Sequence, residues 1–220
     1  MKVELVSYSK PSDELFDKGI INLQELVAYC ARVSNPGNQY NTETSEKLIR
    51  YLIKNSHWSP MEMASVCLSI ETTRDIARQI LRHRSFSFQE FSQRYAVADL
   101  GVVLKEARLQ DTKNRQNSLE TDDKDLATRW EIKQQRIADL SSDVYDWAIK
   151  HGIAKEQARA VLPEGLTVSR LYMQGTLRSW LHYIELRSGP ETQKEHREIA
   201  VACAKTLESI FPMASEFIVK

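Results

Sequence analysis

The sequence predicts an α+β fold: a mixed chain of 220 residues, about half helix, with a few strands near its N-terminus. Three observations lead to this prediction. Residues 64–71, ASVCLSIE, alternate apolar and polar side chains as a half-buried strand does. The pairs Asn22/Glu25 and Thr72/Asp75 have the spacing of capping boxes, which open helices. Apolar residues in the C-terminal half recur every three or four positions, the period of an amphipathic helix.

The N-terminal half is expected to contain strands, helices and one strong turn. In order, these are a strand at 3–5, a helix from 22, a turn at 35–38, a helix ending before Ser59-Pro60, the strand at 64–71 and a helix from 72 to about 82. The apolar stripes of the three helices are Leu23, Leu26, Val27 and Cys30, then Leu48, Ile49, Leu52 and Ile53, then Ile76, Ala77, Ile80 and Leu81.

The C-terminal half is expected to be helical after a polar loop or insertion at 106–125. A long helix runs to Lys150 with a buried seam, and a short helix stops at Pro163. A further helix ends at Ser188-Gly189, and Pro190 opens the last one. The apolar residues assigned to the long helix are Ile137, Leu140, Val144, Trp147 and Ala148, those of the next long helix are Met173, Leu177, Trp180, Leu181 and Ile184, and those of the last are Ile199, Cys203, Leu207 and Ile210.

Composition narrows the class of protein. The formal net charge is +0 and 42% of residues are hydrophobic, which is ordinary for a globular domain and unlike a general polyanion binder. No apolar run approaches the ~20 residues of a membrane helix, and no signal peptide is visible, so we expect a cytoplasmic protein without membrane association. Three widely spaced cysteines predict buried free thiols rather than disulfides. The five histidines lack metal-binding spacing, so no metal is expected.

Residues 74–94 are dense in arginine. Arg74, Arg78 and Arg82 lie about one helical turn apart and form one ridge on the predicted helix. The segment holds five arginines against two acids, an excess of three positive charges, and no lysine occurs between Lys54 and Lys105. Only arginine binds phosphate or carboxylate with a planar fork. The pattern therefore predicts an anion site whose counterion is not part of the chain.

Two kinds of anionic ligand fit this pattern. One is a nucleotide or dinucleotide cofactor. The other is single-stranded nucleic acid, in which arginines contact phosphates and rings such as Phe86, Phe88 and Phe91 stack on bases. A third interpretation is a scaffold whose arginines pair with acids elsewhere in the fold. The neutral net charge disfavours nucleic acid, and the absence of glycine-rich phosphate motifs means that side chains would contact the phosphates.

The same segment resembles a known family. Residues 82–94 match the R-H-R-x-x-S-x-x-x-x-S-x-R pattern of flavin-dependent thymidylate synthases. Other segments resemble that family in the same order, namely residues 31–34, 57–62, 158–163, 178–179 and 186–187. The resemblance extends over the whole chain. It implies the family's fold, a mixed helical domain with a small, mainly antiparallel sheet, as a single domain over residues 1–220.

The resemblance implies reductive methylation of dUMP to dTMP. Methylenetetrahydrofolate supplies the carbon, NADPH supplies the hydride and FAD relays it, in a homotetramer with active sites built from several subunits. The residues that match positions holding dUMP are Gln79, Arg82, Glu90, Phe91, Ser92, Gln93, Arg94, Arg159 and Arg187. Those that match the surroundings of FAD are Ser34, His57, Ser59, Glu62, Arg82, His83, Arg84, Glu90, Thr176, Arg178 and His182.

Arg187 is the residue implied to act catalytically, by contacting the uracil edge and favouring its ionised form. That role is chemically sound, because a guanidinium beside N3 and O4 stabilises negative charge developing on the ring. The cysteines lie on a strand or on apolar helix stripes, where nothing would activate a thiolate. Ser92 with His83 as its base is a rival assignment. The flanking arginines suit phosphate binding better, so we interpret the Ser92 hydroxyl as a donor to substrate.

Overall fold

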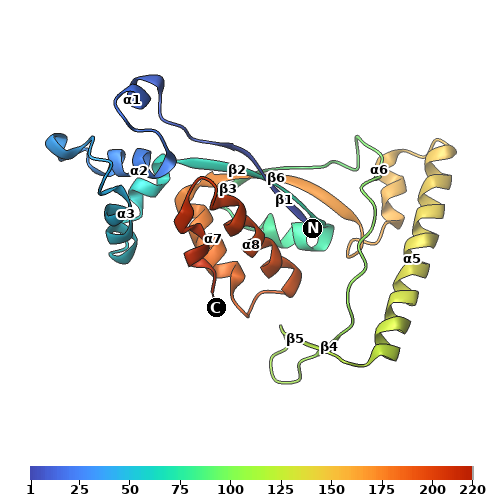
Figure 1. The fold of residues 1–220 in the computed structure, drawn as a ribbon. Helices are drawn as coiled ribbons and strands as arrows, with labels where there is room; N and C mark the ends of the chain where they lie inside the picture. Colours follow the sequence, from blue (N-terminus) through green and yellow to red (C-terminus); the bar gives the residue numbers. More distant parts are fainter. Residues whose placement is uncertain (220) are drawn as a thin grey trace.

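The centre of the molecule is a four-stranded antiparallel sheet (Figure 1). In this computed structural model, which describes residues 1–219, its strands are β1 (Lys2–Tyr8), β2 (Ser65–Thr73), β3 (Phe86–Glu90) and β6 (Val168–Thr176). They lie in the order β1-β2-β6-β3, and each neighbouring pair is antiparallel. Two shorter strands, β4 (Arg108–Gln110) and β5 (Ser118–Glu120), form a separate hairpin. The predicted α+β class with a small antiparallel sheet is confirmed.

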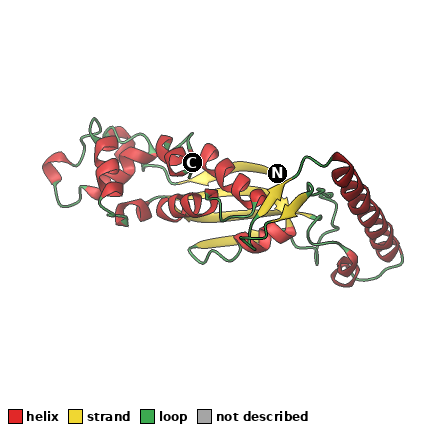
Figure 2. Ribbon diagram, turned by 90° about the horizontal axis from the view of Figure 1, so that it is seen from below, coloured by secondary structure: helices red, strands yellow, loops and turns green. Residues whose placement is uncertain are grey.

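Helices cover one face of the sheet and extend from both of its ends (Figures 1 and 2). The covering helices are α7 (Leu177–Ser188) and α8 (Lys194–Leu207). One end carries α1 (Asp13–Asp17), α2 (Leu23–Ala31) and α3 (Ser45–Lys54), and the other carries α5 (Lys124–Lys150) and α6 (Lys155–Ala158). Helix α4 (Arg74–Ile80) directly continues β2. The short 3-10 helices are η1 (Pro36–Asn38), η2 (Ser59–Met63), η3 (Arg159–Val161) and η4 (Pro212–Phe217).

The core lies between the sheet and helices α7 and α8. Val66, Leu68 and Ile70 of β2 are fully buried, as the alternation of residues 64–71 predicts. They belong to one apolar cluster with Trp180 of α7. The Trp180 indole Nε1 also donates to the carbonyl oxygen of Val66 at 3.0 Å. Helix α7, which carries Arg187, is therefore fixed to the central strand by both packing and a hydrogen bond.

Strand β6 corrects the prediction for residues 168–176. Met173 is expected to lie on the same helix as Leu177, but it lies in β6, and the helix begins only at Leu177. The alternation in this strand is hard to recognise because two of its four buried residues are Ser169 and Gly175, which carry little apolar surface. The pairing of β6 with both β2 and β3 determines the strand instead.

Two further boundaries differ from the prediction. The arginine segment contains β3, in which only Phe86 and Phe88 contribute large apolar side chains, too few for periodicity to reveal a strand. Helix α8 begins at Lys194 rather than at Pro190, and Ile210 lies beyond its end. Both elements depend on contacts with distant segments, since β3 pairs with β6 and α8 packs on α7.

The two predicted capping boxes have different outcomes. Asn22 Oδ1 accepts from the backbone N–H of Glu25 at 2.9 Å, so α2 begins where predicted. The Glu25 carboxylate accepts from the N–H of Ile21 at 2.6 Å rather than from Asn22. Thr72 is wrong as a cap, because it lies inside β2 and Thr73 is the N-cap of α4. The buried Thr72 hydroxyl has no hydrogen-bond partner within residues 1–219.

Helix α5 differs most from the prediction in its burial. It ends at Lys150 as expected, but most of the expected seam is exposed, with fractions of 53%, 65%, 39% and 56% for Ile137, Leu140, Val144 and Trp147. We call these four residues the α5 stripe. Ala148 is the one seam residue that is buried, together with Gln134, Ala138 and Tyr145. Because α5 stands apart from the sheet in both views, only a narrow face of it contacts the rest of the chain (Figures 1 and 2).

The polar stretch 106–125, expected to be a loop or insertion, contains the β4/β5 hairpin. Arg108 of β4 donates from Nη2 to Glu195 in the first turn of α8, and both side chains are only 12% exposed. Gln134 of α5 holds residue Lys105 through two hydrogen bonds of 2.8 Å to its backbone. The hairpin is therefore anchored to the body of the protein at both α8 and α5.

Candidate active site

The arginine ridge of α4 has internal partners, which corrects the prediction that its counterion lies outside the chain. The Glu90 carboxylate lies 3.5 Å from Arg74 Nη1 and 3.1 Å from Arg78 Nη1, and it accepts from the Ser169 hydroxyl at 2.9 Å. Arg78 Nε also donates to Glu164 at 3.0 Å. The sequence does not reveal this pairing, because Glu164 is 86 residues from Arg78 along the chain. Glu90 therefore pairs with Arg74 and Arg78 within the chain itself.

Arg82 and Arg84 remain available in the turn that joins α4 to β3. Both side chains are exposed, and neither forms an ion pair within residues 1–219. A guanidinium without a carboxylate partner keeps all its donors for a ligand. In this turn, the positive charge of the predicted anion site is therefore not neutralised by carboxylates of residues 1–219.

His83 and Arg187, two predicted site residues on different elements, are joined by a hydrogen bond. Arg187, in the last turn of α7, donates from Nε to His83 Nε2 at 2.9 Å. An arginine Nε only donates, so His83 Nε2 accepts and the ring is neutral with its proton on Nδ1. Burial and the Arg187 charge lower the pKa of His83 to about 4, in agreement with that state. Arg187 has no acidic partner within residues 1–219, so its charge is oriented but not cancelled.

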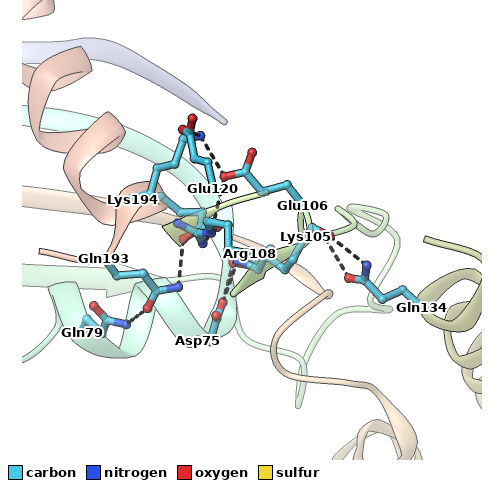
Figure 3. Close-up of polar contacts among 11 residues, drawn as sticks. Asp75, Gln79, Lys105, Glu106, Arg108, Glu120, Gln134, Gln193 and Lys194 are labelled. Carbon is cyan, nitrogen blue, oxygen red and sulfur yellow. Dashed lines mark hydrogen bonds and ion pairs between the residues drawn. The ribbon is translucent and has the colours of Figure 1, made fainter. Parts of the chain in front are cut away.

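Gln79 on α4, a residue predicted to contact dUMP, is held by two residues of the α8 segment. Its Nε2 donates to Gln193 Oε1 at 2.8 Å, and its Oε1 lies 3.3 Å from His196 Nδ1. The other ring nitrogen of His196 lies 3.1 Å from the Tyr183 hydroxyl. Figure 3 shows Gln79 and Gln193 at one end of a polar network that reaches Arg108 and Lys105. Contacts with Gln193 and His196 therefore hold the Gln79 side chain in place.

The loop after β3 meets α6 at Glu156. Arg94 Nε lies 3.4 Å from the Glu156 carboxylate, and Arg159 Nε donates to the Glu156 backbone carbonyl at 3.3 Å. Ser92 Oγ accepts from the backbone N–H of Arg94 at 3.4 Å. Gln93 is buried, and its Nε2 has no acceptor within residues 1–219. Because a buried amide donor left unpaired is costly, this loop is suited to a ligand that supplies an acceptor.

Several residues predicted to surround FAD gather where α7 begins. Arg178 Nη1 donates to Glu62 Oε1 of η2 at 2.6 Å. His182, about one turn further along α7, packs against Trp58 with ring centroids 4.4 Å apart. Thr176 is the N-cap of α7 through its side chain. Helix α7 thus carries residues of this second group at its start and Arg187 at its end.

The structure does not bring all predicted residues together. Ser34 follows the end of α2, His57 follows α3 and Ser59 opens η2. All three are exposed, and no hydrogen bond among residues 1–219 links their side chains to another predicted site residue. A pocket of about 610 Å³ lies elsewhere, between the β4/β5 hairpin, α5 and Gln193, and contains none of the predicted site residues. Ser34, His57 and Ser59 therefore lie on open surface in the single chain.

His196, Tyr183 and Gln193 are absent from the sequence-based site. His196 is expected from sequence to be a surface residue, and this is wrong, since it is fully buried. Its spacing from Ile199 and Cys203 places it on the apolar stripe of α8, which is the signal that indicates burial. Gln193, the N-cap of α8, carries no comparable signal, because the contact that matters is made to α4.

The cysteines do not have the environment of a nucleophile. Burial raises the pKa of Cys30, Cys67 and Cys203, which disfavours the thiolate, and all three are free. Within residues 1–219, no three His, Cys, Asp or Glu side chains are grouped as metal ligands would be. None of the helices in that part of the chain has both the length and the apolar character needed to span a bilayer.

Comparison of the fold identifies the class of protein. The UMP/dUMP methylase PolB from Streptomyces cacaoi, solved with bound 5-Br dUMP, has a TM-score of 0.78 with this chain at 27% identity, covering 98% of this chain and 93% of that one. The same protein solved with 5-Br UMP gives a TM-score of 0.80 at 25% identity, covering 98% and 92%. The α+β fold described above is thus the fold of a nucleotide methylase.

Comparison of the sequence identifies the family. The Thy1 model, described as thymidylate synthase complementing protein, matches residues 20–213. A flavin-dependent thymidylate synthase of Synechocystis sp. is 48% identical over 212 residues, which are 96% of each chain. A probable flavin-dependent thymidylate synthase of Paramecium bursaria Chlorella virus 1 is 47% identical over 212 residues, again 96% of each chain. This chain belongs to the family of flavin-dependent thymidylate synthases.

Proposed function

We propose that this protein carries out the reductive methylation of dUMP to dTMP. FAD is the proposed cofactor, methylenetetrahydrofolate the carbon donor and NADPH the reductant. Membership of the flavin-dependent thymidylate synthase family supports the activity and the flavin. The likeness to a methylase solved with 5-Br dUMP supports the substrate class. The contact between Arg187 and His83 is the observation that carries the chemical argument.

Arg187 is the proposed catalytic residue. His83 engages its Nε at 2.9 Å without cancelling its charge, and both Nη groups stay available. A uracil ring with N3 and O4 against those groups would meet an oriented cation that favours its ionised form, and the electron density of that form at C5 can attack the carbon donor. An acidic residue in place of His83 would remove that field. Since the pKa of His83 is lowered to about 4, the ring stays a neutral acceptor near neutral pH.

The dUMP phosphate is assigned to the arginines around the loop after β3. Arg82 is exposed and unpaired within residues 1–219, while Arg94 and Arg159 share Glu156 as a partner. The Gln93 Nε2 lacks an acceptor, which a substrate oxygen would supply. Ser92 adds a hydroxyl donor at the same place. The contacts of Phe91 and Glu90 with dUMP, and of Glu90 with FAD, stay predictions.

The donors present in the chain fit a dinucleotide cofactor. Arg82 and Arg84 are neighbours in one turn with guanidinium groups free of ion pairs within residues 1–219, as a diphosphate requires. Burial and the Arg178 charge lower the pKa of His182, so the ring beside Trp58 stays neutral and suits packing against a flavin. When bound, the flavin supplies hydride-transfer chemistry. The other residues proposed to hold it are Ser34, His57, Ser59, Glu62, His83, Thr176 and Arg178.

The α5 stripe supports a homotetramer as the working form. An exposed apolar face on a helix that stands apart from the sheet is suited to packing against another copy of the chain. We expect Leu140→Lys combined with Trp147→Lys to lower the solution mass, measured by light scattering, below that of four 25.4 kDa chains. Asp146→Lys, on the polar side of α5, is the matched control and should keep the mass. An unchanged mass in the stripe variant would exclude α5 as the contact.

One anaerobic assay tests the proposed function. The purified protein is expected to be yellow, with a flavin absorbance that dUMP perturbs. It should form dTMP when FAD, NADPH, methylenetetrahydrofolate and dUMP are all supplied, and none when either co-substrate is omitted. A protein that FAD cannot reconstitute, or that forms no dTMP in the complete mixture, would contradict the proposal.

The alternative function, an arginine-rich nucleic-acid-binding module, is not supported. Arg74 and Arg78 are paired with Glu90 and Glu164, so the ridge cannot follow a phosphate backbone as predicted. The family comparison also points to a small-molecule substrate. We further propose the cytoplasm as the protein's location, where its three free cysteines would stay reduced.

A further inference from the structure

The contacts that hold Gln79 begin at an ion pair that is largely shielded from solvent, between Arg108 and Glu195. Glu195 accepts from Arg108 Nη2, and its second oxygen accepts from Gln193 Nε2 at 2.9 Å. Burial opposes ionisation of Glu195, but the hydrogen bonds from Arg108, its own backbone N–H and Gln193 outweigh it and lower its pKa. Near neutral pH the Glu195 carboxylate is therefore ionised, and an ionised carboxylate only accepts hydrogen bonds.

This acceptor determines the direction of every hydrogen bond that follows. Gln193 must turn Nε2 toward Glu195, which leaves Gln193 Oε1 facing Gln79. Gln79 must then donate from Nε2 and turn Oε1 toward His196, which donates from Nδ1. The remaining ring nitrogen of His196 is an acceptor for the Tyr183 hydroxyl. Amide groups are symmetric in shape, so only such a chain of partners can fix which end is which.

His196 closes the far end of this chain. Burial, with smaller effects of Arg187 and His83, lowers its pKa to about 3, so the ring carries one proton near neutral pH. Only one of its two ring nitrogens can therefore donate a hydrogen bond. The Tyr183 hydroxyl, whose pKa burial raises, keeps its proton and donates to Nε2. The His196 proton is therefore on Nδ1 and faces Gln79.

We propose that Glu195, Gln193 and His196 are positioning residues that fix the amide of Gln79 in one orientation for substrate recognition. The inference rests on the proposed function, in which Gln79 contacts dUMP. With one N–H and one carbonyl lone pair already used, Gln79 presents a defined donor and a defined acceptor to the nucleotide. A Gln79 amide that could rotate freely would offer the wrong pair half of the time.

The β4/β5 hairpin belongs to this support. Arg108 comes from β4, and Lys194 of α8 lies 2.8 Å from Glu106 and 3.0 Å from Glu120, so both strands of the hairpin are tied to the start of α8 (Figure 3). The stretch expected to be a loop or insertion thus supplies the cation that keeps Glu195 ionised. The hairpin acts on Gln79 through Glu195 and Gln193, without contacting the substrate itself.

The test compares variants that break the chain with one that keeps it. Gln193→Leu and His196→Leu remove one partner of Gln79 each and are expected to raise KM for dUMP about tenfold, the effect of about one hydrogen bond. Their kcat at saturating dUMP and their flavin absorbance should stay near those of the unmodified protein. His196→Asn, whose amide nitrogen can take the place of Nδ1–H, should restore KM. Glu208→Gln, exposed just past the end of α8, is the control and should change neither value.

The outcomes separate this inference from the proposed function. If the unmodified protein forms dTMP and both leucine variants keep its KM for dUMP, the positioning role is wrong. It is also wrong if kcat falls equally in His196→Asn and His196→Leu with KM unchanged, which would indicate a structural role alone. If the unmodified protein itself does not act on dUMP, the proposed function fails instead. Because Gln193 lies at a helix terminus outside the core, Gln193→Leu is expected to fold even if a change at buried His196 does not.

Discussion

Replacing Arg187 by alanine is expected to lower dTMP formation by about 10²- to 10³-fold while flavin stays bound. The guanidinium has no carboxylate partner within residues 1–219, so alanine leaves no unpaired buried charge and removes only the bond to His83. Loss of one preoriented charge beside the ionised uracil ring costs about 10² to 10³ in kcat. Single-turnover measurement of dTMP with saturating dUMP, beside the flavin absorbance of the same sample, reports both quantities.

Two further variants show whether the orientation of the cation matters as well as its charge. Arg187→Lys keeps a positive charge but cannot donate from an Nε to His83, so we expect turnover between those of the unmodified protein and Arg187→Ala. Arg197→Ala removes an arginine from the neighbouring helix α8 and should leave turnover unchanged. If Arg187→Ala formed dTMP at nearly the normal rate, the assignment of Arg187 as the catalytic residue would be refuted.

Helix α7 illustrates what the sequence predicts well. Its apolar residues Leu177, Trp180, Leu181 and Ile184 are all buried, and it ends at Ser188-Gly189 as expected. A helical period and a terminating glycine are local properties, so they can be read from neighbouring residues alone. The position of Arg187 at the end of this helix follows from the same local signals. The identity of the site residues came from the family resemblance of the motif in 82–94 and of the other matching segments, not from periodicity.

Properties that depend on distant segments could not be predicted. Glu164 neutralises Arg78 from 86 residues away, and β3 exists because it pairs with β6. The α5 stripe is a related case, in which the apolar pattern is real but its four residues are exposed in the single chain. His196 differs, because its helical spacing does indicate burial. Its role at Gln79 emerges only when α4 and α8 meet.

The second large effect is expected at Gly175, a position in β6 directly opposite Phe86 of β3. A Cβ at Gly175 would lie 2.4 Å from Phe86 Cδ1 and 2.5 Å from its Cε1. The Phe86 ring is nearly buried and packs edge-on against Trp180, with ring centroids 4.9 Å apart. The Phe86 ring has little room to move, because the hydrogen bond from the Trp180 indole to the Val66 carbonyl holds the Trp180 ring in place against it.

Gly175→Ala should therefore lower the free energy of unfolding by about 1–3 kcal/mol or more, the usual cost of overpacking a core. Urea denaturation of the flavin-loaded protein measures it. Gly37→Ala is the matched control, because a Cβ there meets no atom within 4 Å. Phe86→Leu would open space beside β6, so the double variant Gly175→Ala/Phe86→Leu should be less destabilised than the sum of the two single changes. Simple additivity, or a Gly175→Ala protein as stable as the unmodified one, would mean that the Phe86 ring is not held against β6. In that case, backbone pairing alone would determine the position of strand β3 and of the arginine turn before it.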